Sequence, residues 1–218
     1  MLTITNLSGF SSGANRPVLT FRFGSDVGSG LSTWTYTSVS IGAASFDRVV
    51  IVAFVGRDLS TNFVTSATIG GSAATIAFAT NTNSFGSIMY LPVTSGTTAD
   101  IVVNLGSGTS SGGAVYVWTL TGASSSTPSY TGSNTALSGV GSVSLTPASG
   151  SAPIFVAAAW GGSNATANIS WTNATSDEAN TSAEGGSSGA NFSASGVLVT
   201  ATSSQVTGTM VIAIAGWT

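Results

Sequence analysis

Short apolar or alternating segments, separated by clusters of glycine, serine and asparagine, recur along almost the whole chain of 218 residues. Segments of this length between turn-forming residues are typical of β-strands, and no stretch carries the apolar stripe of an amphipathic helix. The pattern therefore predicts an all-β fold, an antiparallel β-sandwich of jelly-roll type. The expected strands are Leu2–Leu7, Val18–Phe23, Trp34–Ile41, Arg48–Val55, Val64–Ile69, Ala74–Phe78, Ser87–Pro92, Asp100–Leu105, Ala114–Leu120, Val140–Leu145, Ile154–Trp160, Asn168–Thr172, Gly196–Thr200 and Thr209–Ala215.

A weak internal repeat relates the two halves of the chain. The matching segments are Ser38–Ile41 with Ser142–Leu145, Val50–Ala53 with Ile154–Ala157, and Ala67–Ile69 with Ala167–Ile169. We interpret the chain as a single sandwich domain over residues 1–218, with repeat halves near 34–122 and 138–218. Two separate small sandwiches are an alternative, and strands of similar composition could also match by chance.

The chain carries only 11 charged side chains, four basic and seven acidic, and it contains no histidine, cysteine or lysine. Without histidine and cysteine, neither a Ser-His-Asp or Cys-His nucleophile nor a Cys/His zinc site can form. A phosphate-binding Gly-Lys-Ser/Thr loop needs lysine. Four cations and a formal net charge of −3 argue against binding to nucleic acid. We therefore expect a non-enzymatic protein without a cofactor.

Paired carboxylates for glycoside hydrolysis gain little support from the acidic residues. Such enzymes hold two carboxyl groups about 5–10 Å apart on a rigid scaffold. Asp177 and Glu178 are adjacent in a segment that does not look rigid, and Asp47, next to Arg48, indicates a charged strand end. The sequence therefore offers no convincing pair of catalytic acids.

The segment Gly161–Asn191 differs from the rest, because it holds three of the seven acids and few large apolar residues. This predicts a long exposed excursion, and such loops often carry binding functions. Trp171, Asp177 and Glu178 are the candidate ligand-binding residues, since an indole face can stack on a sugar ring. The two acids with Glu184 could also hold Ca²⁺, although no spaced D-x-D-x-D pattern accompanies them. The alternative is a solvated loop with no ligand.

A surface with so few charges must consist mainly of hydroxyls, small amides and glycine backbone. Isolated β proteins normally use charge to stay dispersed and to block pairing between exposed strand edges. The N-terminus lacks the pattern of a signal peptide, and no apolar run is long enough to cross a membrane as a helix. We expect a protein that is assembled in a cytoplasm and then works in an extracellular particle, with no role at a membrane.

Four segments carry a resemblance to a known class of proteins: Arg48–Phe54, Ala67–Ala74, Leu91–Val103 and Val115–Gly122. In their composition and order, these strands resemble those of small β-rich structural proteins encoded by tailed bacteriophages. The resemblance covers roughly residues 38–122. It implies a virion protein of sandwich or jelly-roll type, on the capsid surface or the tail, that acts as an oligomer.

The first expectation for function is a bacteriophage virion structural protein that decorates the capsid or forms part of the tail or fibre apparatus. Its partners would be other virion proteins and further copies of itself. The alternative is an adhesin module that binds carbohydrate on a host surface through Trp171, Asp177 and Glu178.

Overall fold

The computed structural model describes residues 16–57, 63–80, 84–106, 108–136, 140–144, 153–161, 168–182, 185–193, 198–205 and 209–218. The regular secondary structure within these residues consists of β-strands alone, and all of the strand pairs are antiparallel. The predicted all-β sandwich fold is confirmed. The expected strand Leu2–Leu7 and the acids Asp58 and Glu184 lie outside the described residues.

The first half of the chain folds into two sheets. The larger sheet has the order β1 (Val18–Val27), β9 (Gly112–Thr121), β3 (Val49–Arg57), β7 (Ser84–Pro92) and β6 (Thr75–Ala79). The smaller sheet has the order β2 (Thr33–Ser40), β8 (Thr98–Leu105), β4 (Val64–Ile69) and β5 (Ser72–Ala73). The chain passes repeatedly from one sheet to the other, which is the strand order of a jelly roll.

The second half repeats this strand order, except that β5 has no counterpart among the described residues. Its larger sheet has the order β10 (Tyr130–Ala136), β17 (Met210–Trp217), β12 (Ile154–Gly161), β15 (Gly185–Phe192) and β14 (Thr175–Ser182). Its smaller sheet has the order β11 (Val140–Ser144), β16 (Leu198–Ser203) and β13 (Ile169–Thr172). By position in the sheets, β3 corresponds to β12, β2 to β11 and β4 to β13, and the parts of the repeated sequence segments that form strands within the described residues fall on these equivalent strands. Each repeat unit also includes an edge strand, β1 or β10, that lies N-terminal to the range expected from the sequence.

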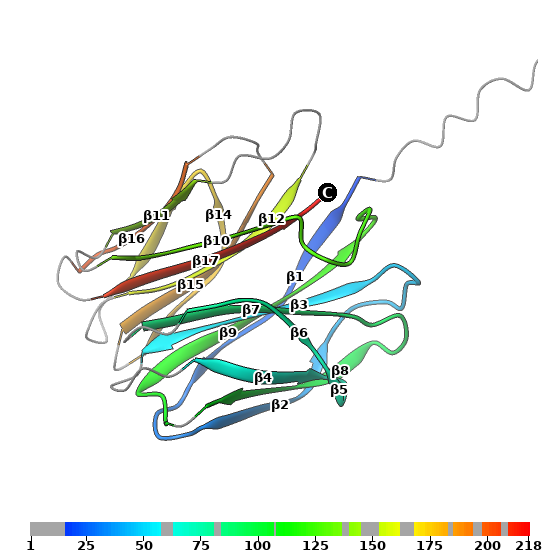
Figure 1. Ribbon diagram of the computed structural model, residues 1–218, viewed down its shortest axis with the longest axis horizontal. Helices are drawn as coiled ribbons and strands as arrows, with labels where there is room; N and C mark the ends of the chain where they lie inside the picture. The colour runs from blue at the N-terminus through cyan, green and yellow to red at the C-terminus, as the bar shows by residue number, and fades with distance from the viewer. Residues whose placement is uncertain are drawn as a thin grey trace, which may run out of the picture.

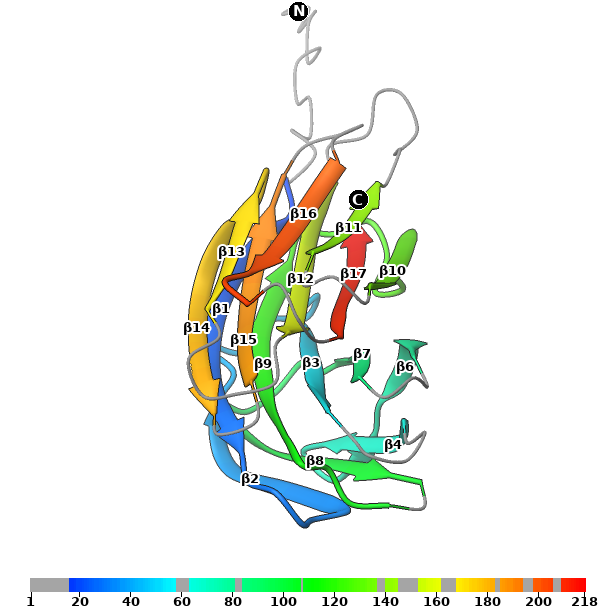
Figure 2. The same ribbon diagram turned by 90° about the vertical axis from the view of Figure 1, so that its left-hand side faces the viewer.

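The four sheets are stacked, and the two larger sheets face each other in the middle (Figures 1 and 2). Among the described residues, three hydrophobic cores separate the layers: one inside each sandwich and one between the two larger sheets. The middle core contains large side chains from both halves, namely Ile51, Tyr116, Trp118, Trp160 and Trp217. The two halves are therefore joined by an apolar interior rather than by a linker alone.

The central strands of the larger sheets are apolar on both faces. In β3, Val50, Val52 and Phe54 point into the first core, while Val49 and Ile51 point into the middle core. The same alternation holds along β12 and β17. An antiparallel strand with one solvated face alternates apolar and polar residues, so uninterrupted apolar runs require burial on both faces. This explains why β3 and β17 are apolar at nearly every position.

The outer faces of the smaller sheets carry mainly hydroxyl and amide side chains. One cross-strand row consists of Thr33, Asn104 and Ser66. Thr33 Oγ1 donates to Asn104 Oδ1 at 2.8 Å, and Asn104 Nδ2 donates to Ser66 Oγ at 3.1 Å. On the opposite side of the molecule, Thr202 and Ser170 form a similar row. Both solvent-facing sheets thus present neutral polar side chains to water.

Arg48 is buried, with 1% of its surface exposed, immediately before β3. Its guanidinium donates to six backbone carbonyls at 2.6 to 3.1 Å: those of Ile41, Gly42, Ala43, Val93, Ser95 and Gly96. Burial, with a smaller contribution from the charge of Arg22, lowers the pKa of Arg48. Arg48 lies at a strand end as expected, but inside the protein, where it holds two loops together.

The sequence interpretation of residues 161–191 as a long exposed excursion is wrong. The described part of this segment forms β13, β14 and most of β15, and β15 is buried at every position except Asn191. The segment lacks large apolar residues because its glycines and serines let the backbone approach the side chains of the opposite sheet. β10 was not predicted from the sequence for a related reason, because residues 131–135 of this edge strand, TGSNT, include no apolar side chain.

Candidate ligand-binding sites

Trp171 lies on β13, half-buried against the inner core of the second sandwich. Its Nε1 donates to Ser188 Oγ at 2.9 Å, and that hydroxyl in turn donates to the backbone carbonyl of Glu178 at 2.8 Å. The indole nitrogen is therefore engaged by the protein itself. Trp171 does not project as the free aromatic platform that the sequence interpretation required.

Asp177 lies on β14, at a bulge where the pairing with β15 shifts register between Ser176 and Glu178. Its carboxylate accepts from Trp118 Nε1 at 2.7 Å and from Asn191 Nδ2 at 2.6 Å. One donor belongs to the first sandwich and the other to the second. Asp177 thus bridges the two sandwiches, and burial raises its pKa while the two hydrogen bonds oppose that rise.

The polar contact between β9 and the β14–β15 hairpin is termed the seam here, and it consists of Tyr116, Trp118, Asp177, Ser187 and Asn191. Tyr116 is fully buried, and its hydroxyl donates to Ser187 Oγ at 2.8 Å. Burial raises the pKa of Tyr116 far above its usual range. These hydrogen bonds fix how the two larger sheets face each other.

Gly189 of β15 makes the close approach at the seam possible. A Cβ atom at this position would lie 2.7 Å from Tyr116 Cγ and 3.1 Å from Trp118 Cζ2. Both ring systems are fully buried, so neither can swing into solvent. Position 189 therefore requires glycine.

Glu178 lies beside β1 of the first sandwich. A Cβ atom on Gly24 would fall 2.5 Å from Glu178 Oε2, which places the carboxylate directly over the β1 backbone. Asp26 is nearby on the same strand, and its pKa is raised by burial and by the charge of Glu178. The structure thus brings Asp177 and Glu178 to the face of the sheet opposite Trp171, and the three residues do not converge on one ligand site.

No group of three or more acidic side chains that could hold a metal ion occurs within the described residues. Asp177 is occupied by its hydrogen bonds to Trp118 and Asn191, and Glu184 lies outside the described residues. The structure thus offers no support for the calcium site considered from the sequence.

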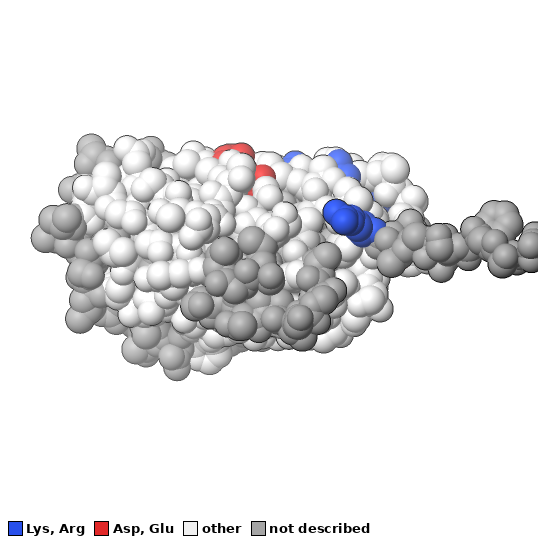
Figure 3. All heavy atoms as spheres, turned by 90° about the horizontal axis from the view of Figure 1, so that it is seen from above, with Lys and Arg blue, Asp and Glu red and all other residues white. Residues whose placement is uncertain are grey.

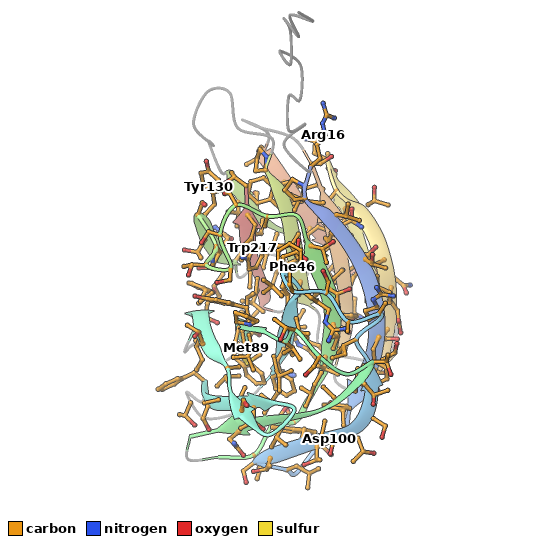
Figure 4. All side chains as sticks on the ribbon, turned by 90° about the vertical axis from the view of Figure 1, so that its right-hand side faces the viewer. Arg16, Phe46, Met89, Asp100, Tyr130 and Trp217 are labelled. Atoms are coloured by element: carbon orange, nitrogen blue, oxygen red, sulfur yellow. The ribbon has the colours of Figure 1, made fainter. Side chains whose placement is uncertain are left out.

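A second candidate site is a hollow of about 300 Å³ at one end of the first sandwich. It is formed by the start of β1, the loop before β3 and the end of β9, and includes Arg16, Val18, Phe46 and Asp47. Phe46 is 89% exposed, more than any other large apolar side chain among the described residues. Figure 4 shows Arg16 extending away from the body at the top of the view, with Phe46 below it in the middle part of the molecule.

Asp47 is held rigidly in this hollow. Its Oδ2 accepts from the Gly122 N–H at 2.7 Å, and its Oδ1 accepts from the Ser45 hydroxyl. These hydrogen bonds, that of Ser45 first, hold the pKa of Asp47 below its usual value. This site was not predicted from the sequence, although a phenylalanine in the polar turn Ser45-Phe46-Asp47 is a signal for it.

Charged groups are sparse on the surface of the described residues. In the view of Figure 3, a few basic and acidic side chains are visible, and most of the described surface carries none. The rows of hydroxyls on the outer sheets account for this neutral character.

Comparison with known protein families and with curated proteins finds no match for this chain. Among the described residues there is no helix of the length and apolarity needed to cross a membrane.

Lowering the pH from about 7 to about 4 is expected to stabilise the protein. Asp177 and Asp26 both have a pKa raised above the ordinary 3.8. A carboxyl group with a higher pKa in the folded state binds its proton more tightly there, so folding becomes more favourable as the pH falls through that raised pKa. Asp47 has the opposite shift, so its stabilising contribution is lost only as the pH falls below 3.8 through its lowered pKa.

Thermal unfolding followed by circular dichroism between about pH 7 and pH 3 would measure this. The melting temperature should rise on acidification and then fall again at the lowest pH. The variant Glu178→Gln removes the charge that faces Asp26, so its curve should rise less steeply. A melting temperature that falls steadily from neutral pH would contradict the expectation.

Proposed function

We propose that this protein is a structural component of a bacteriophage virion, which decorates the capsid or forms part of the tail or fibre apparatus. It acts through assembly with other virion proteins and with copies of itself rather than through catalysis. It is made in the host cytoplasm and works on the assembled particle.

The observation that carries the proposal is the outer surface of the four-layer body. Both exposed sheets present neutral rows such as Thr33, Asn104 and Ser66, while the apolar residues fill three internal cores. A neutral exterior leaves few charged groups for unspecific binding. With only four arginines and no lysine, the chain also has few cleavage sites for trypsin-like proteases. These properties suit a protein that is exposed outside a cell.

The rigid double sandwich also supports a mechanical role. In the described residues, the two halves share the middle core and are linked by the hydrogen bonds of Asp177 and Tyr116. Such a body transmits force and holds a fixed shape. Carbohydrate stacking at Trp171 is no part of this proposal, because its indole packs inward.

Assembly can be tested with the purified full chain and with phage particles. Light scattering coupled to size-exclusion chromatography should give a defined oligomer. Antibodies against the protein should label intact particles by immunogold electron microscopy. The proposal is overturned if the protein remains strictly monomeric and the antibodies label no virion.

A further inference from the structure

We propose that the hollow beside Phe46 binds a pyranose ring of a glycan, a function beyond virion assembly. The sugar would lie with one C–H face on the Phe46 ring and with hydroxyl groups directed toward Asp47. This site is separate from the residues Trp171, Asp177 and Glu178 that the sequence suggested.

Phe46 supplies the stacking surface. Its 89% exposure contrasts with that of aromatic residues such as Tyr90 and Trp118, which are buried. The face of an aromatic ring is electron-rich. The C–H groups on one face of a pyranose ring carry partial positive charge, so the two surfaces attract and both lose water on contact.

The loop that presents Phe46 is held by hydrogen bonds of the two residues that follow it. Before strand β3, Asp47 is fixed by Ser45 and Gly122, and the next residue, Arg48, is fixed by six backbone carbonyls. A side chain held on such a loop loses little conformational freedom when a ligand binds. An exposed aromatic residue on a fixed loop is a preorganised binding element.

Asp47 supplies directional recognition. Each carboxylate oxygen has two lone-pair sites, and the structure uses hydrogen bonds from the Gly122 N–H, the Ser45 hydroxyl and the backbone of Asp47 itself. The remaining lone pairs can accept hydrogen bonds from sugar hydroxyls. The lowered pKa of Asp47 keeps the carboxylate ionised at neutral pH, as an acceptor requires.

The size and the remaining lining fit a single sugar residue. A hollow of about 300 Å³ lies at the lower end of the range for ligand pockets. Val18 adds apolar surface, and Arg16, which also lines the hollow, is a long side chain whose guanidinium can donate to hydroxyl or carboxylate oxygens of a ligand. The lining thus combines one aromatic face, one fixed acceptor and one donor.

A glycan array of neutral, N-acetylated and sialylated oligosaccharides, probed with the labelled full chain, tests the proposal. We expect binding to at least one pyranose-containing glycan. Phe46→Ala should weaken that binding about tenfold or more, and Phe46→Tyr should retain it. Phe63→Ala is the matched control, because Phe63 is also an exposed phenylalanine (41%) but does not line the hollow.

Thermal unfolding of the same variants shows whether the fold is intact. Phe46→Ala should melt like the wild type, since an exposed ring contributes little packing. The proposal is overturned if the wild type binds no glycan on the array, if Phe46→Ala binds as well as the wild type, or if Phe63→Ala loses binding equally. Virion assembly is measured by light scattering and immunogold labelling, so failure of one proposal does not decide the other.

Discussion

Replacement of Arg48 by methionine is expected to lower the free energy of unfolding by about 3–5 kcal/mol. Methionine preserves much of the apolar volume but leaves six backbone carbonyls, three of them in residues 41–43, without the Arg48 donor, and among these the carbonyl of Ile41 belongs to a buried residue. A buried acceptor without a partner loses its hydrogen bonds to water and gains nothing in exchange. Chemical denaturation followed by tryptophan fluorescence would measure the loss.

Two matched variants show whether the guanidinium itself is responsible. Arg22→Met removes an arginine whose Nε donates to Thr119 Oγ1, and it should cost far less. Arg48→Lys keeps the charge but supplies three donors instead of five, so it should lose most of the stability that Arg48→Met loses. If Arg48→Met is no less stable than Arg22→Met, the carbonyl cluster does not depend on Arg48.

Replacement of Gly189 by alanine is expected to cost about 2–3 kcal/mol, although it adds only one methyl group. The new Cβ would lie 2.7 Å from Cγ and 2.8 Å from Cδ1 of Tyr116, atoms near the base of a fully buried side chain. Relief requires the two larger sheets to move apart, which weakens the hydrogen bonds from Tyr116 to Ser187 and from Trp118 to Asp177. Thermal unfolding would show a lower melting temperature.

The control for Gly189→Ala is Gly28→Ala, because a Cβ atom on Gly28 meets nothing within 4 Å. That variant should melt close to the wild type. A double variant with Tyr116→Ala should be more stable than the sum of the two single losses predicts, since removing the ring makes room for the methyl group. Additive losses would show that the contact between Gly189 and Tyr116 is not the cause.

The sequence predicted the fold class well where apolar side chains mark a strand. Val49–Val55 and Val211–Ala215 stand out because residues on both faces of β3 and β17 are buried. The uninterrupted apolar character of β3 and β17 also indicated burial on a second face, which the middle core provides. A strand with one solvent-exposed face would alternate apolar and polar residues. β14 and β15 escaped prediction because serine, glycine and acidic residues there serve close packing and hydrogen bonding rather than apolar burial.

The candidate site was less predictable, because it depends on which side of a strand a residue faces. Trp171, Asp177 and Glu178 are close in sequence, but a turn and the bulge in β14 place the tryptophan and the two acids on opposite faces of a sheet. Trp118, the partner of Asp177, is 59 residues away in the chain. Contacts over such separations arise from topology, and local patterns do not encode them. Phe46 could have been noticed from its polar neighbours alone.

The middle core also determines when apolar surface is covered during synthesis. All strands of the first sandwich precede residue 122, whereas β12 and β17, which cover Ile51 and Trp118, follow it. At about 5–20 residues per second, the ribosome needs roughly 5–20 s to proceed from β9 to β17. During this interval the first sandwich presents a broad apolar face to every other nascent chain nearby. Variants that slow folding of the second half should therefore reduce the yield of protein in the cell more than its stability once folded.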